Sequence, residues 1–313
     1  MTATQRSMEG RRVVVTGAGG FLGPHVVNAF AAEGARVFAL LGPPDVSVRE
    51  PEGAERLARG DVCDEKLMDE LVAGADAVMH LAGPSSVSAS FNDPAKFIRT
   101  HTEGTAVTLQ ACKSRGVRRF VYISSAEVYG RPPASPVDES QPVAARSPYG
   151  AAKIGAEKLV EAFAAAYALE AIILRPFSVY GPGAIAEALI PQLIAMAQAN
   201  GRLTVRDLKP VRDYCFVGDV ARAVVLAAQA KLSQAEVLNV GTGIGTSVAQ
   251  VAAKVLEALG LCGDVGEAEQ RDRPGASEIY ELVADASRAR RVLGWSPRVS
   301  LDEGLRLTIR GQT

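Results

Sequence analysis

Tyr149 and Lys153 stand four residues apart in the stretch SPYGAAKIGAEK, a spacing that places both side chains on one face of a helix. A free tyrosine titrates near pH ~10, so a tyrosine acting as a base near neutrality needs its pKa lowered by roughly 3 units. A neighbouring ammonium group and a second positive charge in a dry cleft can stabilise the phenolate to that extent. We therefore predict proton transfer by Tyr149 with Lys153 as its electrostatic partner. The structural alternative is an amphipathic helix with a tyrosine at the edge of its solvent-exposed face.

A second reactive stretch, SSAEVYG, contains Ser124, Ser125 and Glu127. The alternation in RRFVYISS predicts a strand that ends near Ser125, with the two serines on opposite faces. Glu127 then lies in the loop at the carboxyl end of the strand, where ligands bind in a parallel sheet. Two interpretations of Glu127 remain open, a surface glutamate and a catalytic base.

A glycine-rich turn, TGAGGFLG, follows the first predicted strand and contains Gly17, Gly20 and Gly23. Glycines let backbone N–H groups approach a pyrophosphate, and the positive amino end of the following helix favours its charge. As the first strand-to-helix connection of a βαβ unit, this turn predicts a dinucleotide site.

The ribose end of that site lacks the acidic residue that usually closes the second strand, because residues 40–43 are leucine, leucine, glycine and proline. We expect Asp61 and Val62 in GDVCD to receive the adenine edge, with a plain turn as the alternative for Asp61. NAD is the expected cofactor. NADP stays open, because the missing acid is the residue that binds the ribose hydroxyls of NAD.

Strand and helix patterns alternate along the first half of the chain. Strands are predicted at 11–17, 35–41, 75–83, 117–125 and 169–176, and helices between them include 21–34 and 147–168. This alternation predicts an α/β fold, a doubly wound parallel sheet with helices on both faces.

A smaller C-terminal substrate-binding lobe is expected where this rhythm loosens. We place the dinucleotide-binding domain at 1–175 and the lobe at 176–313. Because βα patterning returns there, parts near 211–245 are expected to rejoin the first domain.

The composition excludes several classes of partner. The formal net charge is -1 and no long basic run occurs, so no nucleic-acid partner is expected. The 4 cysteines form no CxxC pair and the 3 histidines are scattered, so we expect no metal site and reduced thiols in the cytoplasm. No membrane segment is expected either, because Glu157, Lys158 and Glu161 mark a wet face on the longest apolar helix.

Further motifs occur in a fixed order along the chain: TGAGGFLG, HLAG, YISSAEVYG, YGAAK, RPFSVYGPG, RDYCFVGDVARA and RPGASE…LGWSP. Together they resemble the extended short-chain dehydrogenases/reductases, specifically the nucleotide-sugar epimerase and dehydratase family. The resemblance implies a Rossmann sheet and an NAD-dependent enzyme. It makes Tyr149 the base, Lys153 its partner and ribose ligand, and Ser125 the hydroxyl that meets the sugar oxygen.

The resemblance also implies the contacts of a cofactor and of a nucleoside-diphosphate sugar. The implied cofactor contacts are Gly17, Gly20, Phe21, Leu22, Gly23, Asp61, Val62, Leu81, Ala82, Tyr149 and Lys153. The implied substrate contacts are Ser85, Ser125, Ser178, Arg212 and Arg273, where the two guanidinium forks suit a diphosphate and unpaired surface arginines are the alternative. His101 and Ser178 stand where the family commonly has asparagine, so altered binding geometry is expected.

The family chemistry implies that Tyr149 takes the proton of the sugar 4-hydroxyl while hydride leaves C4, which gives a bound 4-keto sugar. A 4-epimerase needs only rotation of this intermediate and return of the hydride. A 4,6-dehydratase commonly uses an Asp–Glu pair after the catalytic Ser/Thr, and this chain has Ala126 and Glu127 there. We expect an NDP-hexose or NDP-hexuronate 4-epimerase. The close alternative is an NDP-sugar dehydratase, of 4,6- or 5,6-type, with Glu127 as its base.

Two other functions are less consistent with the sequence. An NDP-glucuronate decarboxylase ranks third, because Gly183 and Ala184 replace the arginine and serine that this branch usually has. A non-catalytic dinucleotide-sensing protein is disfavoured by the intact serine, tyrosine and lysine set. Apolar helices around 105–112 and 151–166 resemble those that pair in family dimers, so a homodimer is predicted.

Overall fold

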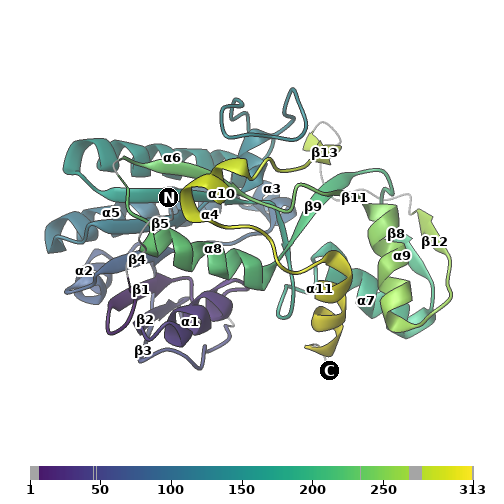
Figure 1. Cartoon of the computed structure of the whole chain (residues 1–313), viewed down its shortest axis with the longest axis horizontal. Coiled ribbons are helices and arrows are strands. Elements are labelled where there is room, and N and C mark those ends of the chain that lie inside the picture. Colours follow the sequence, from purple (N-terminus) through teal and green to yellow (C-terminus); the bar gives the residue numbers. More distant parts are fainter. Residues whose placement is uncertain (1–6, 45, 47, 233, 268–276, 312–313) are drawn as a thin grey trace.

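A computed structural model describes residues 7–44, 46, 48–232, 234–267 and 277–311. Two parts are visible in Figure 1, a larger part built on a long sheet and a smaller group of helices and short strands at one end. No helix among the described residues has both the length and the apolar character that crossing a membrane requires.

The larger part is built on a parallel sheet. In the described part of the chain this sheet has 7 strands in the order β10-β6-β5-β4-β1-β2-β3. The strands are β1 (Arg12–Thr16), β2 (Arg36–Leu41), β3 (Arg56–Arg59), β4 (Ala77–His80), β5 (Arg119–Ile123), β6 (Glu170–Pro176) and β10 (Glu236–Val240). Most are buried on both sides, which explains their continuous apolar sequences. The predicted α/β fold with a doubly wound parallel sheet is confirmed.

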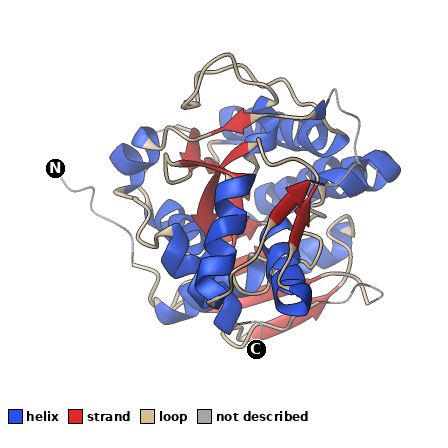
Figure 2. Ribbon diagram, turned by 90° about the vertical axis from the view of Figure 1, so that its right-hand side faces the viewer, coloured by secondary structure: helices blue, strands red, loops and turns tan. Residues whose placement is uncertain are grey.

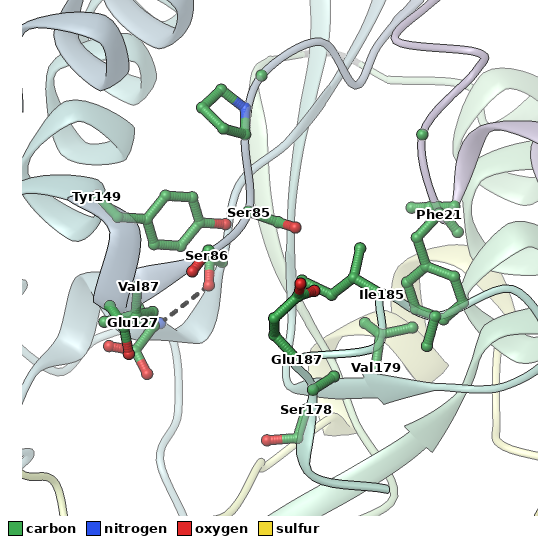
Figure 3. A pocket seen from close by; sticks show the side chains of 18 of the residues that line it. Phe21, Ser85, Ser86, Val87, Glu127, Tyr149, Ser178, Val179, Ile185 and Glu187 are labelled. Atoms are coloured by element: carbon green, nitrogen blue, oxygen red, sulfur yellow. Dashed lines mark hydrogen bonds between the residues drawn. The ribbon is translucent and has the colours of Figure 1, made fainter. Parts of the chain in front are cut away.

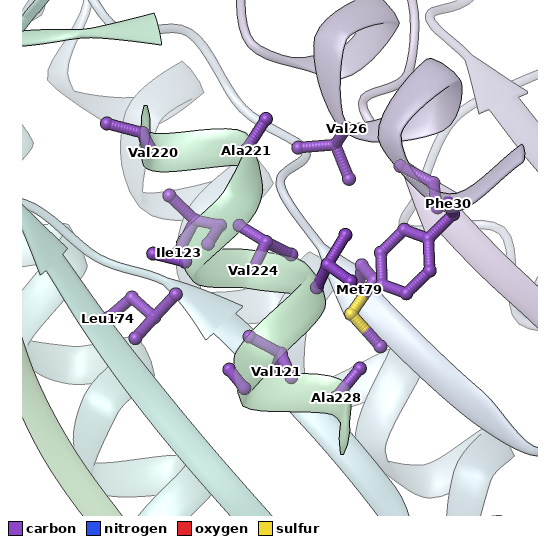
Figure 4. Close-up of a cluster of buried hydrophobic side chains, with 14 of the residues drawn as sticks. Val26, Phe30, Met79, Val121, Ile123, Leu174, Val220, Ala221, Val224 and Ala228 are labelled. Atoms are coloured by element: carbon purple, nitrogen blue, oxygen red, sulfur yellow. The ribbon is translucent and has the colours of Figure 1, made fainter. Parts of the chain in front are cut away.

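Helices cover both faces of this sheet. On one face lie α1 (Gly23–Ala32) and α8 (Val217–Gln229). The other face is covered by α2 (Glu65–Val72), α5 (Gly104–Arg115) and α6 (Pro148–Tyr167). Figure 4 shows the α8 side chains Val220, Val224 and Ala228 against the apolar residues of the sheet.

The chain returns to the larger sheet after it has entered the smaller lobe. Strand β10 pairs in parallel with β6, with Val237 opposite Ile173. Helix α8, which precedes β10, packs its buried face on the same sheet. The domain boundary at residue 175 stays a prediction, since strand pairing alone does not define where a domain ends.

The smaller lobe has its own apolar core, which includes Leu193, Val251 and Leu305. Its helices are α7 (Leu189–Asn200), α9 (Val248–Leu259) and α11 (Leu301–Arg310). Its strands are β7 (Ser178–Tyr180), β8 (Leu203–Val205), β9 (Val211–Phe216), β11 (Gly245–Ser247), β12 (Val265–Glu267) and β13 (Glu281–Leu282). Figure 2 looks onto the molecule from the side of this lobe.

Shorter elements connect these layers. Helices α3 (Val87–Asn92) and α4 (Pro94–Ile98) lead into a π-helical turn, Arg99–Glu103, that continues as α5. A 3₁₀ helix, Ala126–Tyr129, follows β5, and α10 (Ser287–Leu293) packs beside β10. In a doubly wound sheet the ligand crevice lies where the strand order reverses, here between β1 and β4.

Candidate active site

A cleft of about 2030 Å³ lies between the carboxyl ends of the sheet strands and the smaller lobe. Single ligand pockets are typically about 300–1,000 Å³, so this cleft has room for two ligands. It is lined by every predicted site residue that the structure describes: Gly17, Gly20, Phe21, Leu22, Gly23, Asp61, Val62, Leu81, Ala82, Ser85, Ser125, Glu127, Tyr149, Lys153, Ser178 and Arg212. The remaining one, Arg273, lies outside the described residues.

The glycine-rich turn forms a cradle that side chains would fill. Gly17 has φ +67°, and a Cβ there would lie 2.7 Å from the backbone nitrogen of Ala82. A Cβ on Gly23 would lie 2.4 Å from the carbonyl oxygen of Ala18. Helix α1 begins directly after Leu22, and no side chain caps its first N–H groups. The turn therefore fits the pyrophosphate of a dinucleotide.

The adenosine end of the cleft is largely apolar. Strand β2 ends in buried Leu41, and a Cβ on Gly19 would lie 2.5 Å from the Val48 side chain. Asp61 accepts a hydrogen bond from the Cys63 backbone N–H at 2.9 Å and pairs with Arg99 at 3.0 Å. Asp61 thus forms the turn that the sequence left open, and its contact with adenine stays a prediction.

The side chains of Ser125, Tyr149 and Lys153 come together at the carboxyl end of β5. Ser147 caps helix α6 by accepting from the Gly150 N–H at 3.1 Å, and this places Tyr149 in the first turn. The Ser125 hydroxyl lies near enough to the Tyr149 hydroxyl to lower its pKa. The Lys153 ammonium donates to the Ile123 carbonyl at 2.6 Å and lies 5.9 Å from the centre of the Tyr149 ring.

Burial shifts the pKa values of Tyr149 and Lys153 on α6 toward their uncharged forms. It raises the pKa of Tyr149 to about 12, against a lowering by the nearby Ser125 hydroxyl. It lowers the pKa of Lys153 to about 7, against a raising by the Glu157 carboxylate. The chain alone therefore lacks the lowered Tyr149 pKa that the spacing led us to expect. The second positive charge in that expectation has to come from a bound cofactor.

The 3₁₀ helix after β5 presents Ala126 and Glu127. Ser125 starts this helix, and its Oγ accepts from the Glu127 N–H at 3.2 Å. Ala126 is 3% exposed and packs in an apolar cluster with Phe177. Glu127 lines the same cleft as Tyr149, and its negative charge raises the pKa of Tyr149. Where a 4,6-dehydratase commonly has an Asp–Glu pair after its catalytic Ser/Thr, this chain therefore has one carboxylate, that of Glu127.

Ser124 has a contact that the sequence did not reveal. Strand β5 ends at Ile123, and the buried Ser124 hydroxyl donates to Glu157 at 2.5 Å. The prediction that Glu157 faces water is wrong, because this residue is 0% exposed and pairs with Arg175. A glutamate one helical turn after Lys153 was the available signal, since that spacing places both on one face.

His101 fills the position where asparagine is common. It is buried in the π-helical turn, and its Nε2 lies 2.9 Å from the Pro84 carbonyl oxygen. Its ring contacts the Tyr149 ring edge-on, with 5.4 Å between centroids. Gly83 (φ +134°) makes room for it, because a Cβ there would lie 2.1 Å from the imidazole. His101 thereby supports the segment that carries Ser85.

The far side of the cleft comes from the smaller lobe. Ser178 begins β7, and Arg212 on β9 pairs with Glu278 at 3.5 Å. Figure 3 shows the Tyr149 hydroxyl pointing toward Ser85 and into the space bordered by Glu187. The hydroxyl groups of Tyr149 and Ser85 therefore border the same part of the cleft. Among the described residues, no group of three or more metal-ligating side chains is present.

A family model described as "NAD dependent epimerase/dehydratase family" matches residues 13–241. The chain belongs to this family. The match spans both the glycine-rich turn and the Ser125–Lys153 region. Membership confirms the expected enzyme class and the expected cofactor, NAD.

Individual members of the family are similar over nearly the whole chain. A dTDP-glucose 4,6-dehydratase of Streptomyces niveus is 33% identical over 95% of this chain and 91% of its own length. A UDP-glucose 4-epimerase of Mycolicibacterium smegmatis is 32% identical over 95% of this chain and 97% of its own length. The solved structure of MoeE5 in complex with UDP-glucuronic acid and NAD is 32% identical, with a TM-score of 0.86, and covers 96% of this chain and 98% of that chain.

These epimerase/dehydratase family members divide between two reactions at nearly equal identity. The overall similarity therefore does not separate epimerase from dehydratase. The local chemistry around Ser125 and Tyr149 has to make that distinction.

Proposed function

We propose that this chain is an NAD-dependent nucleoside-diphosphate-sugar 4-epimerase. The observation that carries the proposal is the buried methyl group of Ala126 directly after Ser125. The side chains proposed for oxidation at C4, Ser125, Tyr149 and Lys153, line the same cleft. At the position of Ala126 the chain has no carboxyl group that could help the sugar 6-hydroxyl to leave. The similarity to both a 4-epimerase and a 4,6-dehydratase supports the shared first step.

Each residue of the cluster has a role in that first step. Tyr149 takes the proton of the sugar 4-hydroxyl, and Ser125 hydrogen-bonds the same oxygen. Lys153 stabilises the phenolate and holds the cofactor ribose. NAD, held by the glycine-rich turn and by Lys153, would supply the hydride acceptor for oxidation at C4 and the hydride donor for the return step. The cleft must let the keto sugar rotate, and its total volume of about 2030 Å³ supports this.

The nucleoside diphosphate is proposed to lie against the smaller lobe. Arg212 and Ser178 line that wall, and Arg212 supplies positive charge for a diphosphate. Arg273 is proposed as a second diphosphate ligand from the family motif. The MoeE5 complex with UDP-glucuronic acid supports a nucleotide sugar as the substrate class.

A dehydratase is the second candidate, because Glu127 keeps a carboxylate in the cleft that Tyr149 lines. In that reaction Glu127 removes the C5 proton, and water has to leave without the usual acid. The decarboxylase ranks behind both.

One experiment separates the three reactions. The protein with NAD is incubated with a panel of nucleoside-diphosphate hexoses and uronic acids in deuterated water, and the products are separated by chromatography and read by mass spectrometry. We expect an isomer of unchanged mass. Deuterium at C5 with loss of water contradicts the proposal in favour of the dehydratase, and loss of carbon dioxide from a uronic acid indicates the decarboxylase.

We further propose a cytoplasmic homodimer formed by α5 and α6. Small residues Ala151, Ala162 and Ala165 lie exposed along α6 together with Lys158, and small residues allow two helices to approach closely. Light scattering at micromolar concentration should give twice the chain mass. A monomer mass contradicts this part of the proposal.

A further inference from the structure

A buried ion pair lies beneath the candidate active site. Arg175 on β6 donates to both carboxylate oxygens of Glu157 on α6, at 2.9 and 2.7 Å. Glu157 is 0% exposed and Arg175 is 4% exposed. Replacing a buried ion pair by apolar side chains is often neutral or stabilising, so stability alone does not explain its presence.

The ion pair contacts both ends of one short segment, residues 124–129, which we call the catalytic turn. At the start of the turn, the Ser124 hydroxyl donates to Glu157 at 2.5 Å. At its end, Arg175 donates to the Tyr129 hydroxyl at 2.9 Å. Ser125 lies inside this turn, so its backbone is held on both sides by the same pair of charges.

The same ion pair is anchored in the helix that carries the base. Glu157 follows Lys153 by four residues and Tyr149 by eight on α6, so the three share one face of the helix. Helix α6 and the catalytic turn are therefore joined through the Ser124–Glu157 hydrogen bond, and Ser125 of the turn lies near Tyr149 of the helix.

The contacts extend to the strand that the chain adds last to the large sheet. The Tyr129 hydroxyl donates to the Asn239 side-chain oxygen at 2.7 Å, and the Asn239 amide donates to the Val137 carbonyl at 2.8 Å. Asn239 lies on β10 and is fully buried. The catalytic turn is thereby tied to the edge strand as well as to α6.

We infer that Glu157 and Arg175 are positioning residues that hold the Ser125 hydroxyl against Tyr149, with Ser124 and Tyr129 as their two contacts on the catalytic turn. The kinetic part of this inference rests on the proposed function. The Glu157 carboxylate also raises the pKa of Lys153. Glu157 therefore affects Lys153 directly and Ser125 through the catalytic turn.

The test removes the hydroxyl contacts and leaves the ion pair intact, because an unpaired buried charge strongly destabilises a protein. The variants are Ser124→Ala, Tyr129→Phe and the double variant. Thr108→Val is the matched control, since it removes a buried hydroxyl that bonds only the Gly104 carbonyl within α5. All are measured as holoenzyme with NAD.

The first readout is steady-state kinetics on the sugar that the wild type converts. We expect kcat to fall roughly ten- to hundred-fold in the double variant, with KM within about twofold, because a misplaced hydroxyl impairs the reaction more than binding. The Thr108→Val control should keep wild-type kcat. Wild-type kcat in the double variant overturns the inference and leaves the proposed function intact.

The second readout does not require a known substrate. Tyrosine side chains are labelled with ¹³C, and Tyr149 is assigned by its missing signal in Tyr149→Phe and titrated by NMR. Since the nearby Ser125 hydroxyl lowers the Tyr149 pKa, a displaced Ser125 should move this titration to higher pH in the double variant and leave it unchanged in Thr108→Val. An unchanged titration overturns the inference, even if no sugar on the panel reacts.

Discussion

Tyr149 is placed where burial opposes the charge that its proposed role requires. Its pKa is raised to about 12 by burial, while Ser125 and Lys153 surround the same hydroxyl and ring. Exposure to solvent would ease ionisation, but it would also weaken the electrostatic effect of each neighbour. In its proposed role as a base, Tyr149 would therefore depend on the positive charge of its neighbours.

Replacing Tyr149 by phenylalanine removes the proton acceptor and keeps the ring contact with His101. We expect kcat for 4-keto formation to fall by about 10²–10⁴, the usual contribution of a general base. Reduction of bound NAD after addition of sugar measures this step. Binding of NAD itself should stay within about twofold, and a Tyr149→Phe variant with wild-type NAD reduction contradicts the assigned role.

Glu127 separates the two candidate reactions. In an epimerase Glu127→Gln should leave kcat within about threefold, because no proton is taken from C5. In a dehydratase the same change removes the only carboxylate after Ser125 and should lower kcat by about 10² or more. Product formation by mass spectrometry checks this, and a loss of all epimer product in Glu127→Gln contradicts the epimerase assignment.

Spacing along the sequence was sufficient to predict which residues meet at Tyr149, but not what lies beneath them. Tyr149 and Lys153 share a helical face, and Ser125 follows a strand. The Ser124–Glu157 bond joins residues 33 positions apart. Glu157 is buried only because Arg175 on β6 pairs with it, and helical periodicity contains no information about a neighbouring strand.

At the scale of elements, the turn between β1 and α1 combines two constraints on Gly17. Its φ of +67° disfavours any side chain, and the Ala82 backbone occupies the space that a Cβ needs. Gly116 at the end of α5 has φ +70° but no atom within 4 Å of its Cβ position. Comparing substitutions at these two glycines therefore separates the effect of backbone strain from the effect of steric exclusion.

Gly17→Ala should weaken NAD binding at least tenfold and lower the melting temperature, because the turn has to move away from β4. Gly116→Ala has only the strain of a left-handed alanine, about 1–2 kcal/mol, and should bind NAD as the wild type does. Calorimetric titration with NAD and thermal unfolding measure both effects. Equal NAD affinity in the two variants contradicts the steric explanation.

Element types followed from sequence more readily than element ends. Strand β4 was expected to reach Gly83, yet it ends at His80 because the chain turns away at Leu81 to line the cleft. The π-helical turn around His101 had no local signal, since hydrogen bonds from i to i+5 depend on what packs against the helix.

At the scale of the whole molecule, a buried histidine couples folding to pH. His80 lies between the hydroxyls of Thr16, at 2.8 Å, and Thr105, at 3.0 Å, and joins β1, β4 and α5. Burial, and to a smaller extent the Lys153 charge, lower its pKa to about 3. The folded state therefore keeps His80 neutral where the unfolded chain, with a pKa near ~6.5, takes up a proton.

Stability should consequently fall as pH drops from ~6.5 toward ~3, by at most about 1.4 kcal/mol per pH unit for this group. The pKa of buried His101 is lowered in the same direction and adds to the slope. Urea unfolding between pH 7 and pH 4.5 measures it. A His80→Asn variant should show a shallower dependence, and an identical slope contradicts the assignment.

The order in which the sheet is assembled has a consequence for synthesis. When β6 emerges from the ribosome, the sheet still lacks α8, so apolar residues such as Val121, Ile123 and Leu174 have nothing over them on that side. At about 5–20 residues per second, several seconds pass before α8 and then β10 follow. During that interval the nascent chain exposes an apolar sheet face and the unpaired edge of β6. A chaperone that shields both would raise the yield of folded enzyme.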